Sequence, residues 1–270
     1  SATRAMIDGG RNLGLVVLRR AMALAMDKAR AHDVAVVTVR NCGHTGRMGE
    51  YAVQAAREGF VATVLGTGSR KGGSVAPYGS VTPALNTNPM AWAVPSGRFP
   101  AVFLDFATSV VAWGKIEAAI DKGVPIPKGW LLGPDGQATT DPHDYRRGGV
   151  LLPFGGHKGS GLSFMVEALA GAMTGVGCAP LETYTSDFGT VLTALRVEAF
   201  QPLDEYRRTV DALVAAIKAG RPAPGVTEAL VPGEFEWRTR EERLRDGLAL
   251  PEATWQRVVA AAERCGVPVP

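Results

Sequence analysis

The strongest constraint on the fold is the alternation of helical and strand patterns in the first quarter of the sequence. Residues 13–30 carry apolar side chains at the spacing of a helix with a broad buried face, and residues 34–39 (VAVVTV) have the composition of a buried strand. Residues 50–58 then predict a short helix that ends at Gly59, and residues 60–65 predict a second strand. This order predicts an α/β fold in which helices cover a sheet.

The rest of the chain continues this alternation around one long irregular region. Strands are predicted at residues 90–94, 101–104 and 191–197, and helices at about 109–122, 159–174, 204–219, 238–246 and 252–265. Gly66 and Gly68 follow a strand, but the glycines and prolines after them do not open a helix, so a Rossmann turn is rejected. A loop as long as residues 66–97 is often functional.

Composition and charge exclude several classes of protein. The 270 residues, 46% apolar and 20% charged, are ordinary for a globular chain of one large or two modest domains. The net charge of +3 is not gathered into basic runs, so nucleic acid is not expected as a partner. No apolar run is long enough for a membrane span, and the start lacks a signal-peptide pattern. The three separated cysteines predict neither a metal site nor a disulfide framework, which fits the reducing cytoplasm.

A glycine-rich segment, GGHKGSG at residues 155–161, precedes a helix predicted to reach about residue 174. Free backbone N–H groups and the positive end of the helix dipole would face one point there, with Lys158 beside them. A cofactor phosphate suits this point, although a glycine-rich turn with a solvated lysine has the same spacing. The pattern is not a Walker loop, because no Gly-Lys-Ser/Thr follows a four-residue spacer.

His44 is the candidate acid/base among the four histidines. It lies in NCGHTGRMG, between a buried strand and a short helix, and histidine exchanges protons with an alcohol oxygen near neutral pH. The alternative is a loop histidine that hydrogen-bonds its own turn. Asp105 ends a predicted strand, where open α/β sheets bind ligands, and its alternative is a helix cap. His157 is expected to position the glycine-rich backbone or a phosphate.

Four stretches, in order, resemble the malate/L-lactate dehydrogenase family of the second type, which includes ureidoglycolate and sulfolactate dehydrogenases and the piperideine-2-carboxylate reductases. They are NCGHTGRMGEYA, VAPYGSVTPALNTNPMAWAVP, LDFATSVVAWGKI with the GW and TTDP that follow, and LLPFGGHKGSGL. The PGE turn at residues 232–234 also fits. The ordered set covers nearly the whole chain, which makes the resemblance specific.

The resemblance implies a mixed α/β sheet of the L-sulfolactate-dehydrogenase-like, non-Rossmann architecture, usually as a homodimer. It implies NADH or NADPH as the cofactor, with hydride transfer to or from a small 2-oxo acid/2-hydroxy acid pair or a cyclic imine. His44 falls on the family's catalytic histidine, and Thr87 falls near a substrate contact. The implied cofactor contacts are Thr45, Gly46, Arg47, Met48, Asp105, Phe106, Ala107, Gly156, His157, Lys158, Gly159, Gly233 and Glu234.

The resemblance also implies a division of the chain and one departure from the family. Residues 1–65 correspond to part of a substrate and dimer domain, residues 66–200 to a cofactor-binding region, and residues 201–270 to helices that return to the first domain. The family's N-terminal helical segment, whose G-x-x-S-H-G-x-x-R-like motif supplies an arginine for the substrate carboxylate, has no counterpart here. Arg47 is expected to replace that cation or to reach an adenosine 2′-phosphate. Two alternatives remain open: a non-catalytic member that binds cofactor or a partner, and a two-chain enzyme with a separate N-terminal chain.

Overall fold

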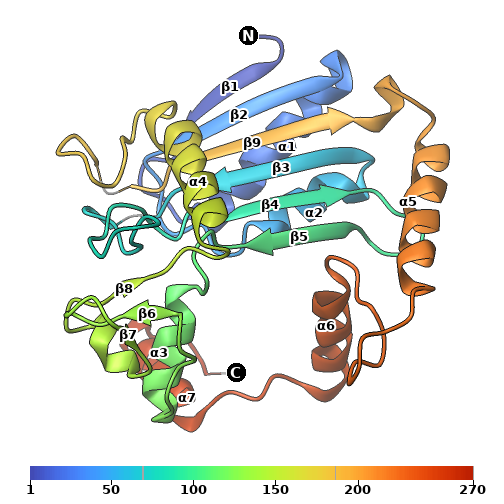
Figure 1. The fold of residues 1–270 in the computed structure, drawn as a ribbon. Coiled ribbons are helices and arrows are strands. Elements are labelled where there is room, and N and C mark those ends of the chain that lie inside the picture. Colours follow the sequence, from blue (N-terminus) through green and yellow to red (C-terminus); the bar gives the residue numbers. More distant parts are fainter. Residues whose placement is uncertain (69, 186, 270) are drawn as a thin grey trace. The chain divides into compact units, whose positions relative to one another are not determined.

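The computed structural model describes residues 1–68, 70–185 and 187–269, which form two compact units, 1–232 and 233–270 (Figure 1). The centre of the larger unit is a six-stranded sheet with the strand order β1-β2-β9-β3-β4-β5. Its strands are β1 (Arg4–Asp8), β2 (Val34–Arg40), β3 (Phe60–Gly66), β4 (Met90–Val94), β5 (Val102–Phe106) and β9 (Thr190–Arg196). β1 and β2 are parallel and the other pairs are antiparallel, so the predicted mixed α/β fold is confirmed.

The strand β1 was not predicted from the sequence, where residues 1–12 showed no clear pattern. It lies at the edge of the sheet with only one neighbour, and alternate residues along it are exposed. A strand of five residues with so few buried side chains leaves a weak hydrophobic pattern. Pairing with β2, in which Arg4 lies opposite Val36, is what defines it.

Two helices cover one face of the sheet, behind it in Figure 1. They are α1 (Gly14–His32) and α2 (Gly49–Arg57). In α1, Leu18, Ala21, Met22 and Ala25 are fully buried at the three- and four-residue spacing of one helix face. On the strand side, Val37 and Val39 of β2 are fully buried, as the two-residue period of a strand requires.

One long helical segment covers the other face, in front of the sheet in Figure 1. It consists of α4 (His157–Val166) and a π-helical continuation, η2 (Glu167–Ala172). Val166 and Ala170 are buried there against Met90 and Val191. The outward side of the same segment exposes the large apolar residues Leu162, Phe164, Met165 and Leu169, and Met173 directly after it is exposed as well.

A smaller three-stranded sheet, in the order β7-β6-β8, has a core of its own within the larger unit. Its strands are β6 (Leu131–Leu132), β7 (Ala138–Thr139) and β8 (Val150–Leu151), flanked by α3 (Trp113–Lys122) and the 3-10 helix η1 (Pro142–Tyr145). The sequence predicted only turns between 124 and 142. The long loop between β3 and β4 joins this core, because Val75 bridges to both Leu85 and Leu151.

The larger unit ends with the short 3-10 helix η3 (Val197–Ala199) and the helix α5 (Leu203–Lys218). The smaller unit contains α6 (Glu234–Asp246) and α7 (Glu252–Cys265). The predicted start of α6 at residue 238 was wrong, because Gly233 adopts a left-handed conformation and the helix begins directly after it. Among the described helices, none is both long and apolar enough to span a bilayer.

Candidate active site

The predicted site segments meet at one end of the large sheet. Strands β1, β2, β3 and β5 all finish at this end, while β4 and β9 begin there: Val39 lies opposite Thr190, and Met90 lies opposite Phe106. The loops next to these strand ends carry His44 and Thr87, and Asp105 lies near the end of β5. The topology therefore brings together three residues from segments far apart in the sequence.

His44 is exposed, and its imidazole is held on two sides. The backbone N–H of Gly46 donates a hydrogen bond to Nδ1 at 3.1 Å, and the ring meets the Phe188 ring edge to face with centroids 5.4 Å apart. Because Nδ1 accepts this bond, the single proton of the neutral imidazole lies on Nε2. Among the described residues Nε2 has no partner. His44 therefore hydrogen-bonds its own turn through Nδ1 and at the same time keeps Nε2 available for a ligand.

The backbone around His44 is fixed by contacts from α2 and from the residues at the start of α1. The N–H of Gly43 donates to the Asn12 carbonyl at 2.9 Å, and the Tyr51 hydroxyl donates to the Thr45 carbonyl. Burial, with a smaller effect of the Glu50 charge, raises the pKa of Tyr51 to about 12, so the hydroxyl stays a donor at neutral pH. A Cβ on Gly14, the first residue of α1, would lie 2.2 Å from the Gly43 carbonyl oxygen, so only glycine permits this approach.

Asp105 holds the start of α2. Its Oδ2 accepts a hydrogen bond from the Gly49 N–H at 2.8 Å, and Arg47 Nε lies 3.6 Å from the same oxygen. The Arg47 guanidinium also lies over the Phe103 ring, with Cζ 4.8 Å from the ring centroid. Asp105 therefore binds the first N–H of α2, a helix that precedes it in the chain, as in the helix-cap alternative.

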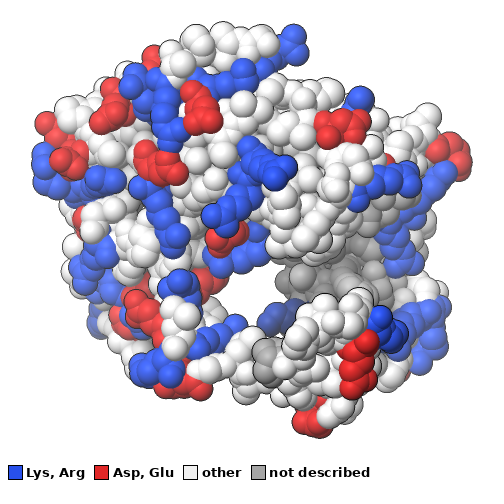
Figure 2. Space-filling model, turned by 180° about the vertical axis from the view of Figure 1, so that it is seen from behind, with Lys and Arg blue, Asp and Glu red and all other residues white. Residues whose placement is uncertain are grey.

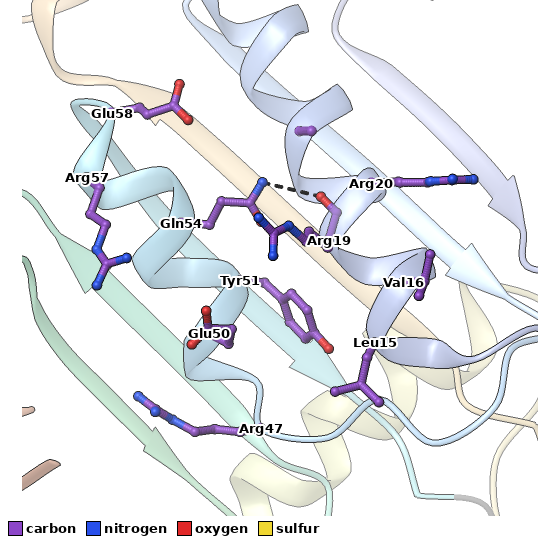
Figure 3. A pocket seen from close by; sticks show the side chains of 11 residues that line it. Leu15, Val16, Arg19, Arg20, Arg47, Glu50, Tyr51, Gln54, Arg57 and Glu58 are labelled. Carbon is purple, nitrogen blue, oxygen red and sulfur yellow. Dashed lines mark hydrogen bonds between the residues drawn. The ribbon is translucent and has the colours of Figure 1, made fainter. Parts of the chain in front are cut away.

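A cavity of about 830 Å³ lies between α1 and α2, next to Arg47 (Figure 3). Leu15 and Val16 line one side, and Tyr51 points toward them from α2 (Figure 3). Its charged lining residues are Arg19, Arg20, Arg47, Arg57, Glu50 and Glu58. On the molecular face seen from behind, basic and acidic side chains are interspersed, in keeping with the absence of basic runs in the sequence (Figure 2). Arg47 is among the residues that line this cavity, and His44 is not.

The glycine-rich segment 155–159, here called the anion loop, has the backbone geometry that its sequence suggested. Gly155 and Gly156 have positive φ angles of 56° and 61°, and α4 starts directly after them. A Cβ on Gly159 would lie 2.1 Å from the Phe154 carbonyl oxygen, so the turn requires glycine. The Lys158 side chain is exposed at the start of α4. The N–H groups of Lys158 and Gly159 donate to the carbonyls of Gly155 and Phe154 within the turn, so these two are not free as the sequence suggested.

Hydrogen bonds tie the anion loop to the other predicted segments. The N–H of Phe154 donates to the Thr108 carbonyl at 3.0 Å, and the Phe154 ring meets Phe106 edge to face at 5.3 Å. Thr108 in turn donates to the Thr87 carbonyl from its N–H at 2.8 Å and from Oγ1 at 3.1 Å. The structure thus joins the Asp105 segment, the Thr87 segment and the anion loop.

The sequence profile of the malate/L-lactate dehydrogenase family matches residues 1–259. The chain belongs to this family. It is 37% identical over 274 residues to the malate dehydrogenase of Pyrococcus horikoshii, covering 97% of this chain and 75% of that protein. The solved malate dehydrogenase of Entamoeba histolytica matches with a TM-score of 0.93 at 27% identity, over 100% of this chain and 79% of that one. The sulfolactate dehydrogenase of Methanocaldococcus jannaschii matches with a TM-score of 0.84 at 35% identity, over 99% and 77%.

These similarities confirm three predictions: the family, its sulfolactate-dehydrogenase-like architecture, and an oxidoreductase of the 2-hydroxy acid dehydrogenase type. They do not test the roles of individual residues. The predicted site residues of this chain differ in their exposure to solvent. Thr45 and Met48, predicted as cofactor contacts, are 2% and 1% exposed, while His44, Arg47, His157 and Lys158 face solvent.

Sequence reasoning missed a buried polar network beside Thr87. Asn88, which is fully buried with a φ of 37°, donates from Nδ2 to Glu167 Oε1 and to Ser163 Oγ, both at 3.0 Å. The other Glu167 oxygen, Oε2, accepts from the Ala179 N–H at 3.1 Å. An acidic residue inside the otherwise apolar helical stretch 164–173 was the available signal. Phe188, the neighbour of His44, was also missed, because nothing in its local sequence marks it.

The described residues contain no group of three or more His, Cys, Asp or Glu side chains placed to hold a metal ion. Cys42 lies two residues before His44 and is buried. Burial, with a smaller effect of the Asp187 charge, raises the pKa of the Cys42 thiol to about 11. Since the thiolate is the reactive form, Cys42 is not a nucleophile at neutral pH.

Proposed function

We propose that the chain transfers hydride between a nicotinamide cofactor, NADH or NADPH, and a small 2-oxo acid/2-hydroxy acid pair or a cyclic imine. The observation that carries the proposal is His44, fixed at the end of the sheet with Nε2 open, in a member of a 2-hydroxy acid dehydrogenase family. The cofactor supplies or takes up the hydride. In the reducing direction, His44 donates a proton from Nε2 to the carbonyl oxygen of the substrate.

The tautomer of His44 sets a condition on this proton transfer. Donation from Nε2 starts from an imidazolium, and acceptance at Nε2 starts from the neutral form protonated at Nδ1. In both forms Nδ1 carries a proton, which would point at the N–H of Gly46. The hydrogen bond from the Gly46 N–H to His44 Nδ1 therefore breaks in each catalytic cycle. The bond seen in the structure is that of the site without substrate.

We further propose that the anion loop binds the cofactor pyrophosphate. The exposed cation of Lys158 at the N-terminus of α4, next to Gly156, supports this, while Gly159 permits the tight turn that places them. Arg47 is proposed to hold the substrate carboxylate or the 2′-phosphate of NADPH, and Thr87 to contact the substrate. The remaining proposed cofactor contacts are Thr45, Gly46, Met48, Asp105, Phe106, Ala107, His157, Gly233 and Glu234. The proposed role of Asp105 is to hold the segment from Arg47 to Gly49, through its contacts with both residues.

A cytoplasmic homodimer is also proposed. Its support is the outward side of the helical segment formed by α4 and η2, where Phe164 is 65% exposed and Met165 is 51% exposed. An apolar face of this kind suits a subunit interface. The division into regions 1–65, 66–200 and 201–270 stays a prediction, as do the two alternatives, a non-catalytic cofactor binder and a two-chain enzyme.

The test is a titration of the purified chain with NADH and NADPH, followed by turnover assays with 2-oxo acids and cyclic imines. Replacement of His44 by alanine is expected to lower turnover by about 10²- to 10⁴-fold, because it removes the acid/base, while cofactor affinity stays unchanged. His143→Ala, at an exposed position in η1, is the matched control. Equal turnover of the His44→Ala variant and the control excludes His44 from the reaction. Cofactor binding without turnover on any substrate favours the non-catalytic alternative.

A further inference from the structure

Tyr78 is an exposed aromatic residue held at the first turn of α4. Its side chain is 67% exposed, although its backbone N–H donates to Ser160 Oγ at 3.1 Å. The residues around it are fixed as well: Ala76 N–H donates to the Leu151 carbonyl at 3.0 Å, and Ser80 N–H donates to the Pro77 carbonyl at 2.9 Å. A rigid backbone thus presents this ring to solvent.

The Tyr78 ring stands directly beside the anion loop. It contacts the His157 ring edge to face, with centroids 5.9 Å apart and an interplanar angle of 70°. A Cβ on Gly156 would lie 3.4 Å from ring carbons Cδ2 and Cε2, so the loop backbone comes within van der Waals reach of the ring. One side of the ring therefore rests on the loop, and most of the ring surface stays available.

An exposed aromatic ring next to a phosphate-binding loop suits a planar heteroaromatic group. Bases stack on aromatic side chains because every base has a π face, and a fixed platform loses little conformational freedom on binding. A dinucleotide carries such a ring on either side of its pyrophosphate. Lys158 offers an exposed charge for the pyrophosphate at the N-terminus of α4, and Tyr78 offers a surface for the ring.

We infer that Tyr78 is the stacking platform for one planar ring of the dinucleotide whose pyrophosphate binds the anion loop. This inference rests on the proposed function. The adenine and nicotinamide rings share the chemistry that Tyr78 recognises, so the two halves of the cofactor have to be tested separately.

The experiment is calorimetric titration of the full chain with the preferred dinucleotide, with ADP-ribose and with reduced nicotinamide mononucleotide. Tyr78→Leu removes the aromatic surface but keeps the backbone N–H that binds Ser160, and Tyr78→Phe keeps the ring. Phe200→Leu is the matched control, because Phe200 is 72% exposed and lies at the end of η3, outside the proposed site. Tyr78→Leu is expected to weaken dinucleotide binding about 10-fold. Tyr78→Phe and Phe200→Leu are expected to bind as the wild type does.

The two halves then identify the ring. If Tyr78→Leu binds ADP-ribose more weakly than the wild type does, the ring on Tyr78 is adenine. If the variant binds reduced nicotinamide mononucleotide more weakly, the ring is nicotinamide. Equal dinucleotide affinity of Tyr78→Leu and the wild type overturns the inference. If Lys158→Gln weakens binding while Tyr78→Leu does not, the proposed cofactor site stands and only the role of Tyr78 fails. If the wild type binds neither NADH nor NADPH, both the site and the platform are excluded.

Discussion

The backbone N–H of Gly46 donates a hydrogen bond to Nδ1 of His44, two residues earlier in the same loop, at 3.1 Å. This bond decides which nitrogen of the proposed acid/base carries the proton at rest. It also means that the imidazole reaches either reactive form only by leaving Gly46, which has a φ of 66° and lies in a loop with a second glycine, Gly43.

The first prediction concerns this tautomer. In the free protein the neutral His44 side chain is expected to be the Nε2–H form, because Nδ1 is occupied by the Gly46 N–H. Two-dimensional ¹H–¹⁵N spectra of the imidazole groups distinguish the two tautomers, and the His44→Ala variant assigns the signal. An Nδ1–H tautomer in the free protein would contradict the hydrogen bond and the release step derived from it.

The second prediction concerns Phe188 as a positioning residue for His44. Its ring is the aromatic neighbour of the imidazole, and an edge-to-face pair contributes about 0.5–1.5 kcal/mol beyond its buried area. Phe188→Leu keeps an apolar side chain but loses the ring edge. We expect kcat to fall by up to about 10-fold, since the imidazole is less well oriented, while the affinity for the cofactor stays the same.

Steady-state kinetics at several pH values separate this role from a general loss of stability. A positioning role changes kcat and its pH profile, whereas a purely structural role lowers the melting temperature without changing the pH profile. Phe200→Leu serves again as the control for loss of an exposed phenyl ring. Identical kcat and pH profile in Phe188→Leu and the wild type would show that Phe188 does not orient His44.

The elements that could be predicted from the sequence are those whose pattern depends on residues close together in the chain. Strands such as β2 and helices such as α1 were predicted because burial on one face imposes a short repeat on the sequence. The backbone of the anion loop was anticipated because positive φ angles select glycine, as at Gly156.

Other features depend on contacts between segments that the sequence does not place together. Phe188 reaches His44 because β9 lies between β2 and β3, which brings the start of β9 to the end of β2. Asp105 caps α2 for the same kind of reason, since β5 ends beside a helix that comes earlier in the chain. The small strands β6 and β7 have only two residues each, too few for a period to show.

The third prediction concerns the pH dependence of stability through Tyr51. Burial raises its pKa from 10 in the unfolded chain to about 12 in the folded chain. Above pH 10 the unfolded state loses the phenolic proton first, so the contribution of Tyr51 to stability is complete below pH 10 and is lost as the pH rises to about 12.

Denaturant unfolding between pH 8 and 12 measures this effect. The Tyr51→Phe variant is expected to be less stable by about 1 kcal/mol at pH 8, because the Thr45 carbonyl loses its donor. Its stability is also expected to fall less steeply above pH 10 than that of the wild type. Parallel curves for the two proteins above pH 10 would show that Tyr51 titrates normally.

The last prediction concerns the buried pair Asn88 and Glu167, which holds the segment next to Thr87. Both Glu167 oxygens accept hydrogen bonds, one from Asn88 Nδ2 and one from the Ala179 N–H. In Glu167→Gln the amide offers only one oxygen for two donors, so one bond is lost. In Asn88→Asp two carboxylates face each other. Each single variant is expected to lower the free energy of unfolding by about 1–3 kcal/mol.

The double variant, Asn88→Asp with Glu167→Gln, tests whether the pair itself carries this stability. The amide nitrogen at position 167 would then donate to the carboxylate at position 88, and the amide oxygen would still accept from the Ala179 N–H. The hydrogen bond across the pair is restored with its direction reversed, and the negative charge moves from position 167 to position 88. We expect the double variant to lose less stability than the sum of the singles, with a coupling of about 1 kcal/mol. Glu198→Gln, at an exposed position in η3, controls for the loss of a surface carboxylate. Additive losses in urea unfolding would mean that the two side chains act separately.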